Sequence, residues 1–364
     1  MKKKKLDYRL KVTFINRCRE LKFLENYVNE EPQSLLFLHG PKSSGKTTLL
    51  FKFLKEIKKK QELDVKFLNL REKLISNYKD FIRLFFGIDY SKSKNDVKEK
   101  REYSLFNFFK LSVEALKGME NGELDPFEVM KAEFIKFNRK GVKPVVIIDE
   151  LQALSKVYID NDKDRELVIA LFNFFVAMTK ESHLAHIIIA SSDGYFLNTV
   201  YNDSRLKKTS RFYRVDYLDK EDVMEWLLNL EKYSKIKAYK LSKEDAEKIW
   251  ETVGGSMWEI QELLSRLFEQ SLDEVLAAYK MAMRGIIAHY TEFNKNKVLV
   301  LGVMNKKETV SVADLEVLPI ESSELKEILR DMVKNNILYF DPTLAVYYPQ
   351  GKSCQWGIRL YFEQ

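Results

Sequence analysis

The feature that most constrains this chain is the stretch at residues 35–48, Leu-Leu-Phe-Leu-His-Gly-Pro-Lys-Ser-Ser-Gly-Lys-Thr-Thr. Its apolar start is typical of a buried strand, and the residues after it have the character of a helix. Between these two elements, Gly40 and Gly45 permit a tight turn whose backbone N–H groups point inward. The start of the helix adds its positive dipole end. The stretch therefore predicts a loop that binds the phosphates of a nucleotide.

The spacing of the loop assigns a role to its last residues. Lys46 would reach the β- and γ-phosphates, and the Thr47 hydroxyl would be a ligand of Mg²⁺. The predicted cofactors are therefore ATP or ADP with Mg²⁺. A chance match in a polar turn is the alternative, and the strand before the loop and the helix after it argue against that. We expect the nucleotide to contact the whole loop, which consists of Gly40, Pro41, Lys42, Ser43, Ser44, Gly45, Lys46, Thr47 and Thr48.

A second motif is the apolar run Val145-Val-Ile-Ile, which ends in Asp149 and Glu150. Such a run fits a strand buried on both faces of a parallel sheet, where ligands bind at the carboxyl ends of the strands. Asp149 would then hold the Mg²⁺ shell, and Glu150 would polarise the attacking water. A strand that runs into a capped helix is the common alternative. The phosphate-binding loop upstream favours the catalytic interpretation.

Length and composition exclude several classes of protein. A chain of 364 residues is long for one domain, so we expect two or three. We expect neither a transmembrane segment nor a secretory signal, because no long apolar run is present. Two distant cysteines, Cys18 and Cys354, and four scattered histidines predict neither a disulfide nor a metal cluster. These observations favour a cytoplasmic protein without a membrane partner.

The order of the predicted elements is that of an α/β fold. Helices alternate with strand candidates, which indicates a parallel sheet. A helix within residues 14–29 precedes the first strand, with Asn16 as its expected N-cap. The strand candidates are residues 35–39, 65–70, 145–149, 186–191 and 212–215.

Three domains follow from this order. Residues 1–218 form the α/β domain, with a helical insertion at about 76–139 that includes a charged patch and the aromatic run from Tyr103. Residues 219–290 form a helical lid. Residues 291–364 contain three helices followed by a hairpin-like pair, which is the order of a winged helix.

Taken together, these motifs resemble the archaeal ATPases of the AAA-like, STAND-related group, which are P-loop NTPases. The two nucleotide motifs are the strongest part of the likeness. Shorter stretches support it by their order. They are the leader Phe14–Leu21 ("F-x-x-R-x-x-E-L"), Leu68–Arg71 ("L-D-L-R", with Asn69 for Asp), His186–Asp193 ("I-x-x-G-S", with Ala190 for Gly), Ser210-Arg211 (for Gly-Arg) and Gly254–Met257 ("G-G-x-P", with Met257 for Pro).

The resemblance implies roles for three further residues. The leader of the family folds over the adenine, so Arg17 is expected to contact the nucleotide. Ser192, chosen over Ser191, would orient the attacking water or the γ-phosphate, although it could also be an ordinary strand-end cap. Arg211 would stabilise the transition state in its own subunit or in a neighbouring one. A surface basic cluster is the alternative for Arg211.

Three functions are compatible with these motifs. The first is a Mg²⁺-dependent, ATP-hydrolysing switch that relays its nucleotide state to the winged helix and a protein partner. The second is a DNA-acting ATPase, similar to origin-binding proteins or helicase loaders. The third, a nucleotide kinase, would need an arginine-rich lid that the sequence does not show. Nucleotide-dependent oligomerisation remains open for all three.

Charge favours the first function. Residues 1–60 contain 16 basic and 6 acidic side chains, whereas residues 291–364 contain 9 basic and 10 acidic ones. Phosphate contacts dominate affinity for DNA, so the near-neutral tail predicts weak DNA binding by the winged helix alone. Any DNA contact is expected through the basic N-terminal region.

Overall fold

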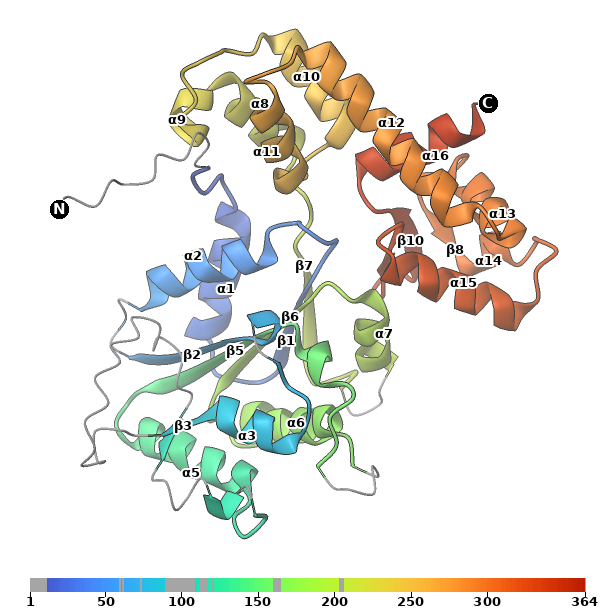
Figure 1. Cartoon of the computed structure of the whole chain (residues 1–364). Coiled ribbons are helices and arrows are strands. Elements are labelled where there is room, and N and C mark those ends of the chain that lie inside the picture. Colours follow the sequence, from blue (N-terminus) through green and yellow to red (C-terminus); the bar gives the residue numbers. More distant parts are fainter. Residues whose placement is uncertain are drawn as a thin grey trace.

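The computed structural model describes residues 12–363 apart from 59, 61, 73, 89–108, 112–116, 120, 160–164 and 203–205. Its centre is a parallel five-stranded sheet with the order β2-β5-β6-β1-β7 (Figure 1). The predicted α/β fold with a parallel sheet is confirmed. The strands are β1 (Leu35–His39), β2 (Leu63–Asn69), β5 (Lys143–Asp149), β6 (His186–Ser191) and β7 (Ser210–Arg214).

Helices cover both faces of the sheet, which explains why the three central strands, β5, β6 and β1, are mainly apolar and buried. Every residue of β1 is buried. Leu36 and Leu38 pack in one core with side chains of α1 (Cys18–Asn29) and α2 (Lys46–Ile57). On the other face, Phe37 packs in a second core with side chains of α3 (Tyr78–Phe85), α5 (Pro126–Arg139) and α6 (Leu167–Val176).

Two sequence predictions need correction here. Helix α1 begins at Cys18 with Arg17 as its N-cap residue, because Arg17 has a left-handed backbone (φ 75°). Asn16, the predicted N-cap, therefore lies one residue before the observed one, although its side chain still accepts a hydrogen bond from the Cys18 amide. The insertion is not purely helical, since β3 (Phe86–Ile88) and β4 (Phe109–Leu111) pair in parallel. The charged patch at 92–102 and residues 103–108 of the aromatic run lie outside the described residues.

A helical bundle follows the last strand of the sheet. Asp219 caps its first helix, and a capping box at Ser242 begins the third. The buried Trp226 packs in its core and donates a hydrogen bond to Ser234. The helices are α8 (Lys220–Leu228), α9 (Leu230–Ser234), α10 (Lys243–Val253), α11 (Met257–Arg266) and α12 (Leu272–Thr291).

The C-terminal elements, called the tail module below, comprise residues 295–362 around a three-stranded antiparallel sheet of order β8-β10-β9. The last segment of the chain is a helix that packs along α12, so closely that a Cβ at Gly357 would lie 2.8 Å from the Met283 carbonyl oxygen. The elements are α13 (Lys295–Met304), β8 (Val310–Ser311), α14 (Val312–Leu315), α15 (Ser322–Lys334), β9 (Leu338–Asp341), β10 (Val346–Pro349) and α16 (Lys352–Phe362).

Helix α12 belongs to two cores. Val275 and Leu276 pack in the bundle, whereas Ile287, nearer its end, packs with the tail module. In Figure 1 the bundle lies above the α2 side of the sheet, and the tail module lies beside α7 (Gly194–Asn202). Within the described part of the chain, no helix combines the length and the apolar character needed to span a bilayer.

Candidate functional site: a nucleotide cleft

The loop between β1 and α2 has the backbone that a phosphate site requires. Three of its residues have positive φ: Gly40 (152°), Ser43 (63°) and Gly45 (91°). A Cβ at Gly40 would lie only 2.0 Å from the Val215 carbonyl oxygen, so a larger residue cannot fit there. Residues 40–45 therefore curve back on themselves and deliver the chain to the start of α2 at Lys46.

Lys46 lies inside this curve. Its ammonium donates hydrogen bonds to the carbonyl oxygens of Gly40 and Pro41, both at 2.9 Å. Burial lowers the pKa of Lys46 to about 8, and the nearby charges of Glu150 and Asp149 oppose that shift. The side chain is still mostly protonated at neutral pH, which suits contact with phosphate oxygens.

Asp149 ends strand β5 directly opposite the loop. The Thr47 hydroxyl donates to one of its carboxylate oxygens at 2.6 Å, and the other oxygen, Oδ1, is buried with no hydrogen-bond partner among the described residues. Burial raises the pKa of Asp149. A threonine hydroxyl beside a carboxylate with an unpartnered oxygen is the kind of oxygen donor set that Mg²⁺ prefers. Thr47 and Asp149 therefore fit the magnesium site that the sequence predicts.

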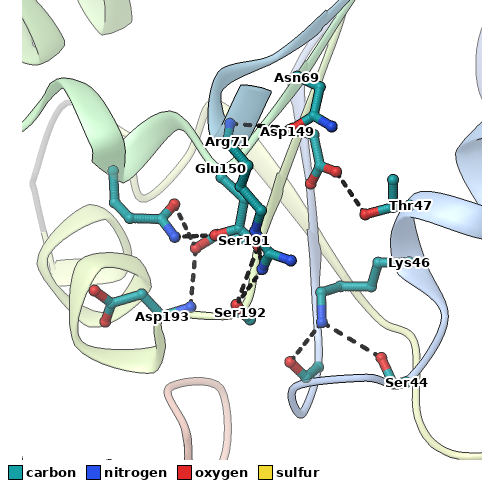
Figure 2. Close-up of polar contacts among 12 residues, drawn as sticks. Ser44, Lys46, Thr47, Asn69, Arg71, Asp149, Glu150, Ser191, Ser192 and Asp193 are labelled. Carbon is teal, nitrogen blue, oxygen red and sulfur yellow. Dashed lines mark hydrogen bonds and ion pairs between the residues drawn. The ribbon is translucent and has the colours of Figure 1, made fainter. Parts of the chain in front are cut away.

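Glu150 leaves the sheet in an unusual conformation. Its backbone is left-handed (φ 65°), and its N–H donates to the Ala190 carbonyl oxygen of the neighbouring strand β6 at 2.8 Å. This turn directs the carboxylate to a cluster of donors. It accepts hydrogen bonds from Arg71, from Gln152 and, at 3.1 Å, from the Ser192 hydroxyl (Figure 2).

The two serines after β6 have different partners. Ser192 contacts Glu150, and Arg71 also lies 3.3 Å from its hydroxyl. Ser191 instead donates to Gln152 at 2.9 Å and accepts from the Asp193 amide. Ser192 is thus the serine that lies beside the proposed base, and its catalytic role stays a prediction.

Arg71 is the residue that sequence reasoning missed. It follows β2 in a 3₁₀ turn, and its guanidinium pairs with the carboxylate of Glu150. The one signal in the sequence is that Arg71 ends the stretch resembling "L-D-L-R", and that stretch alone indicates no role for it.

Arg17 contacts the backbone of the phosphate loop. It is 9% exposed, and it donates to the carbonyl oxygens of Ser44 at 2.9 Å and Asp216 at 2.6 Å and to the carboxylate of Glu20 at 2.7 Å. These contacts hold the loop and the end of β7 together. They fit a positioning role, while direct contact of Arg17 with a nucleotide stays a prediction.

Arg211 is not brought into the site. Its side chain is 43% exposed and forms an ion pair with Glu30 at 2.9 Å. In the sheet, Arg211 pairs with Leu36, three residues before the end of β1. Three residues of strand span about 10 Å, so the geometry does not support contact with a phosphate bound by its own loop. A role for Arg211 in a neighbouring subunit stays a prediction.

A cleft of about 470 Å³ opens above the loop, within the usual size range of small-molecule sites. The loop and β-strand ends form its polar side, and the leader with α11 forms its more apolar side. It is lined by Val12, Thr13, Phe14, Lys42, Ser43, Gly45, Lys46, Thr47, Thr48, Arg71, Glu150, Met257, Trp258 and Gln261.

Comparison with known proteins agrees with this geometry. Residues 14–263 match the family described as an ATPase domain predominantly from Archaea. The chain belongs to this archaeal ATPase family. Two relatives of this chain are uncharacterized ATP-binding proteins. The one from Methanocaldococcus jannaschii is 30% identical over 96% of this chain and 95% of its own length. The one from Pyrococcus abyssi is 33% identical over 96% and 98%.

Solved structures support the same fold. The Walker-type ATPase PABY2304 of Pyrococcus abyssi is similar with a TM-score of 0.64 and 17% identity, covering 95% of this chain and 96% of that one. The ORC2 protein of Aeropyrum pernix, in its ADPNP–ADP complexes, is similar with a TM-score of 0.54 and 12% identity, covering 99% and 96%. At these identities the likeness establishes the α/β P-loop ATPase fold and no more.

Proposed function

We propose that this archaeal ATPase is a Mg²⁺-dependent, ATP-hydrolysing switch whose nucleotide state is relayed to its tail module. The tail has the element order of a winged helix, and we interpret residues 1–218, 219–290 and 291–364 as the ATPase domain, the lid and the winged helix. One observation carries the proposal. His39, the residue directly before the phosphate loop, is hydrogen-bonded through Nδ1 to the Tyr339 hydroxyl of β9 at 3.0 Å.

The hydrolytic chemistry rests on the residues at the strand ends. Bound Mg²⁺, held by Thr47 and Asp149, would neutralise charge on the phosphates. Lys46 would contact the β- and γ-phosphates from inside the loop. Glu150 would orient the attacking water and accept its proton, with Ser192 as a hydrogen-bonding neighbour. Two observations support these roles: Lys46, Thr47 and Glu150 line the cleft, and Asp149 and Ser192 are hydrogen-bonded to Thr47 and Glu150.

The contact between the sheet and the tail extends beyond His39. Arg214 pairs with His39 across strands β7 and β1, and its guanidinium forms an ion pair with Asp341 at 2.9 Å. Asp341 is completely buried. Arg214 also lies over the ring of Tyr348, 4.9 Å from its centroid. Because a buried carboxylate needs its partner, opening this contact requires a compensating gain elsewhere.

The tail also touches the segment that follows Ser192. A Cβ at Gly194 would lie 2.3 Å from the Phe340 carbonyl oxygen, so the hairpin and the start of α7 are in tight contact. The hydroxyls of Tyr195 and Tyr347 are hydrogen-bonded at 3.0 Å.

A third contact involves the loop itself. The Tyr217 hydroxyl donates to the Lys42 carbonyl oxygen at 3.0 Å and accepts from the Gln350 side chain at 3.4 Å. The tail therefore contacts the segment after Ser192 directly and the phosphate loop through Tyr217. A shift in either segment would change the docking free energy of the tail.

The proposal is tested with Glu150→Gln, which should bind ATP but hydrolyse it at least about a hundredfold more slowly, because a positioned general base is lost. In this variant, we expect hydrogen exchange in β9 and β10 to differ between ATP·Mg²⁺ and ADP·Mg²⁺. Lys46→Ala is the matched control, since it should abolish tight ATP binding and with it any difference. Unchanged turnover in Glu150→Gln would remove Glu150 from the mechanism, and identical exchange with both nucleotides would remove the relay.

One observation favours the second function, a DNA-acting ATPase. On α15 two of the three acidic residues turn toward α13, where Asp331 pairs with Lys297 at 2.7 Å and Glu324 accepts from Asn296 at 2.7 Å, while Glu327 is exposed. The exposed face of α15 is then more basic than the sequence count implies. Its basic residues, spaced four apart, are Lys326, Arg330 and Lys334.

This second function has a direct test in the whole protein. We expect weak binding of duplex DNA at 150 mM salt, measured by fluorescence anisotropy, because the tail remains near neutral overall. Submicromolar affinity that is lost when the three basic residues of α15 are replaced by alanine would make the DNA-acting function the better one. The basic segment at residues 1–11 lies outside the described residues.

A further inference from the structure

Trp258 is a large aromatic side chain that is exposed inside the nucleotide cleft. It is the second residue of α11 and is 60% exposed. The other tryptophans have protein partners: Trp226 bonds to Ser234, Trp250 lies under Lys352, and Trp356 bonds to the Glu251 carbonyl oxygen. No such contact of the Trp258 ring is found among the described residues. The exposed face of the Trp258 ring is therefore available for contact with a ligand in the cleft.

The position of α11 limits what that ligand can be. A Cβ at Gly45 would lie 3.9 Å from the Met257 sulfur, so the start of α11 lies over the end of the phosphate loop. Met257, Trp258 and Gln261 form one face of the helix, because residues three and four apart are neighbours. All three line the cleft, and all three are uncharged. This side of the cleft suits a flat, neutral ring better than a phosphate.

The same cleft is also lined by the groups proposed to bind phosphates. Lys46 and Thr47 line the cleft together with Trp258. A nucleotide with its phosphates in the loop would thus extend its base toward α11 and the leader residue Phe14. Aromatic side chains stack on bases whatever their sequence, since every base has a π-face.

We propose that Trp258 stacks on the base of the nucleotide bound in this cleft and supplies much of the affinity for the base. The proposal rests on the proposed ATP-binding function and deepens it. Glu259, the next residue of α11, faces the other way and accepts hydrogen bonds from Ser353 of α16 and from Tyr279 at 2.8 Å. Stacking on Trp258 therefore connects occupancy of the base site to the helix that ends the tail module.

The test compares two ligands that differ in the base. Isothermal titration with ATP·Mg²⁺ and with inorganic triphosphate·Mg²⁺ is performed on the wild type, Trp258→Ala and Trp258→Phe. We expect Trp258→Ala to weaken ATP binding by between about 5-fold and 150-fold, the range of base–aromatic stacking, without changing triphosphate binding. Trp258→Phe should keep most of the affinity, because it keeps an aromatic face. Trp356→Phe is the matched control and should bind ATP normally.

Fluorescence gives a second measurement that needs no alanine variant. The emission of the wild type should change with ATP but not with triphosphate, and the change should be absent in Trp258→Phe. Wild-type ATP affinity in Trp258→Ala, or an equal loss for ATP and triphosphate, would overturn the proposal while leaving the ATPase function intact. If the wild type itself bound no ATP, the proposed function would fail instead.

Discussion

The structure predicts that this protein loses stability in mild acid through a buried histidine, His186. It is the first residue of β6, it is completely buried, and neither ring nitrogen has a hydrogen-bond partner among the described residues. Its ring packs edge-on against Tyr27, with 5.3 Å between ring centroids. Burial lowers the pKa of His186 to about 4, and the charge of Lys143 adds to the shift.

The direction and size of the effect follow from proton linkage. An unfolded histidine has a pKa of about 6.5, so below that pH the unfolded chain binds a proton that the folded chain rejects. The stability from the neutral ring is fully present above pH 6.5 and is lost as the pH falls toward 4. At pH 5 the unfolded histidine is almost fully protonated and the folded one is not, a difference of about 2 kcal/mol.

The measurement is urea unfolding at pH 7.5 and pH 5.0, followed by far-ultraviolet circular dichroism. We expect the free energy of unfolding to fall less between these pH values in His186→Leu than in the wild type, by about 2 kcal/mol. His39, whose pKa is also lowered to about 4 by burial, is present in both proteins, so its contribution cancels. His289→Gln, which changes an exposed histidine, is the control. Its free energy of unfolding should have the same pH dependence as that of the wild type. Equal pH dependence of the wild type and His186→Leu would refute the argument.

Two further predictions concern the cleft. Arg71→Ala should lower turnover at least about threefold with little change in KM, since its side-chain hydrogen bonds in the described part of the chain are to Glu150 and Ser192. Steady-state kinetics would contradict this if KM alone changed. Arg211→Ala should leave turnover unchanged in dilute, monomeric protein, because Arg211 is held by Glu30 away from the cleft. It should lower turnover only at concentrations where subunits associate, and a loss in the monomer would show that the arginine does act in its own chain.

The sheet could be predicted because its physical signals are local. Strands buried on both faces are continuous apolar runs, and Asp149 and Glu150 stand where such a run meets polar residues. The loop pattern at residues 40–47 requires a strand before it and a helix after it, so it also predicts these two elements. The close approach of Thr47 to Asp149 followed from the parallel arrangement alone.

The remaining features depend on contacts between distant residues. Arg71 and Glu150 are separated by 79 positions, and His39 and Tyr339 by 300, so no spacing in the sequence indicates either pair. The exposed face of α15 is more basic than a count of charges in the sequence indicates, because Asp331 pairs with Lys297 of α13. The family resemblance predicts Arg211 near the phosphates. The register of β7 with β1 puts it beside Leu36, away from the phosphate loop of its own chain.

The sharing of α12 between two cores has a mechanical consequence. The helix has 20 residues and is therefore about 30 Å long. Because one end is packed in the bundle and the other in the tail, it can act as a lever arm. A rotation of only about 10° at the bundle end would displace the far end by about 5 Å, the length of one helical turn. Small adjustments of α11 around a ligand would thus become large movements of the tail, with neither core required to repack.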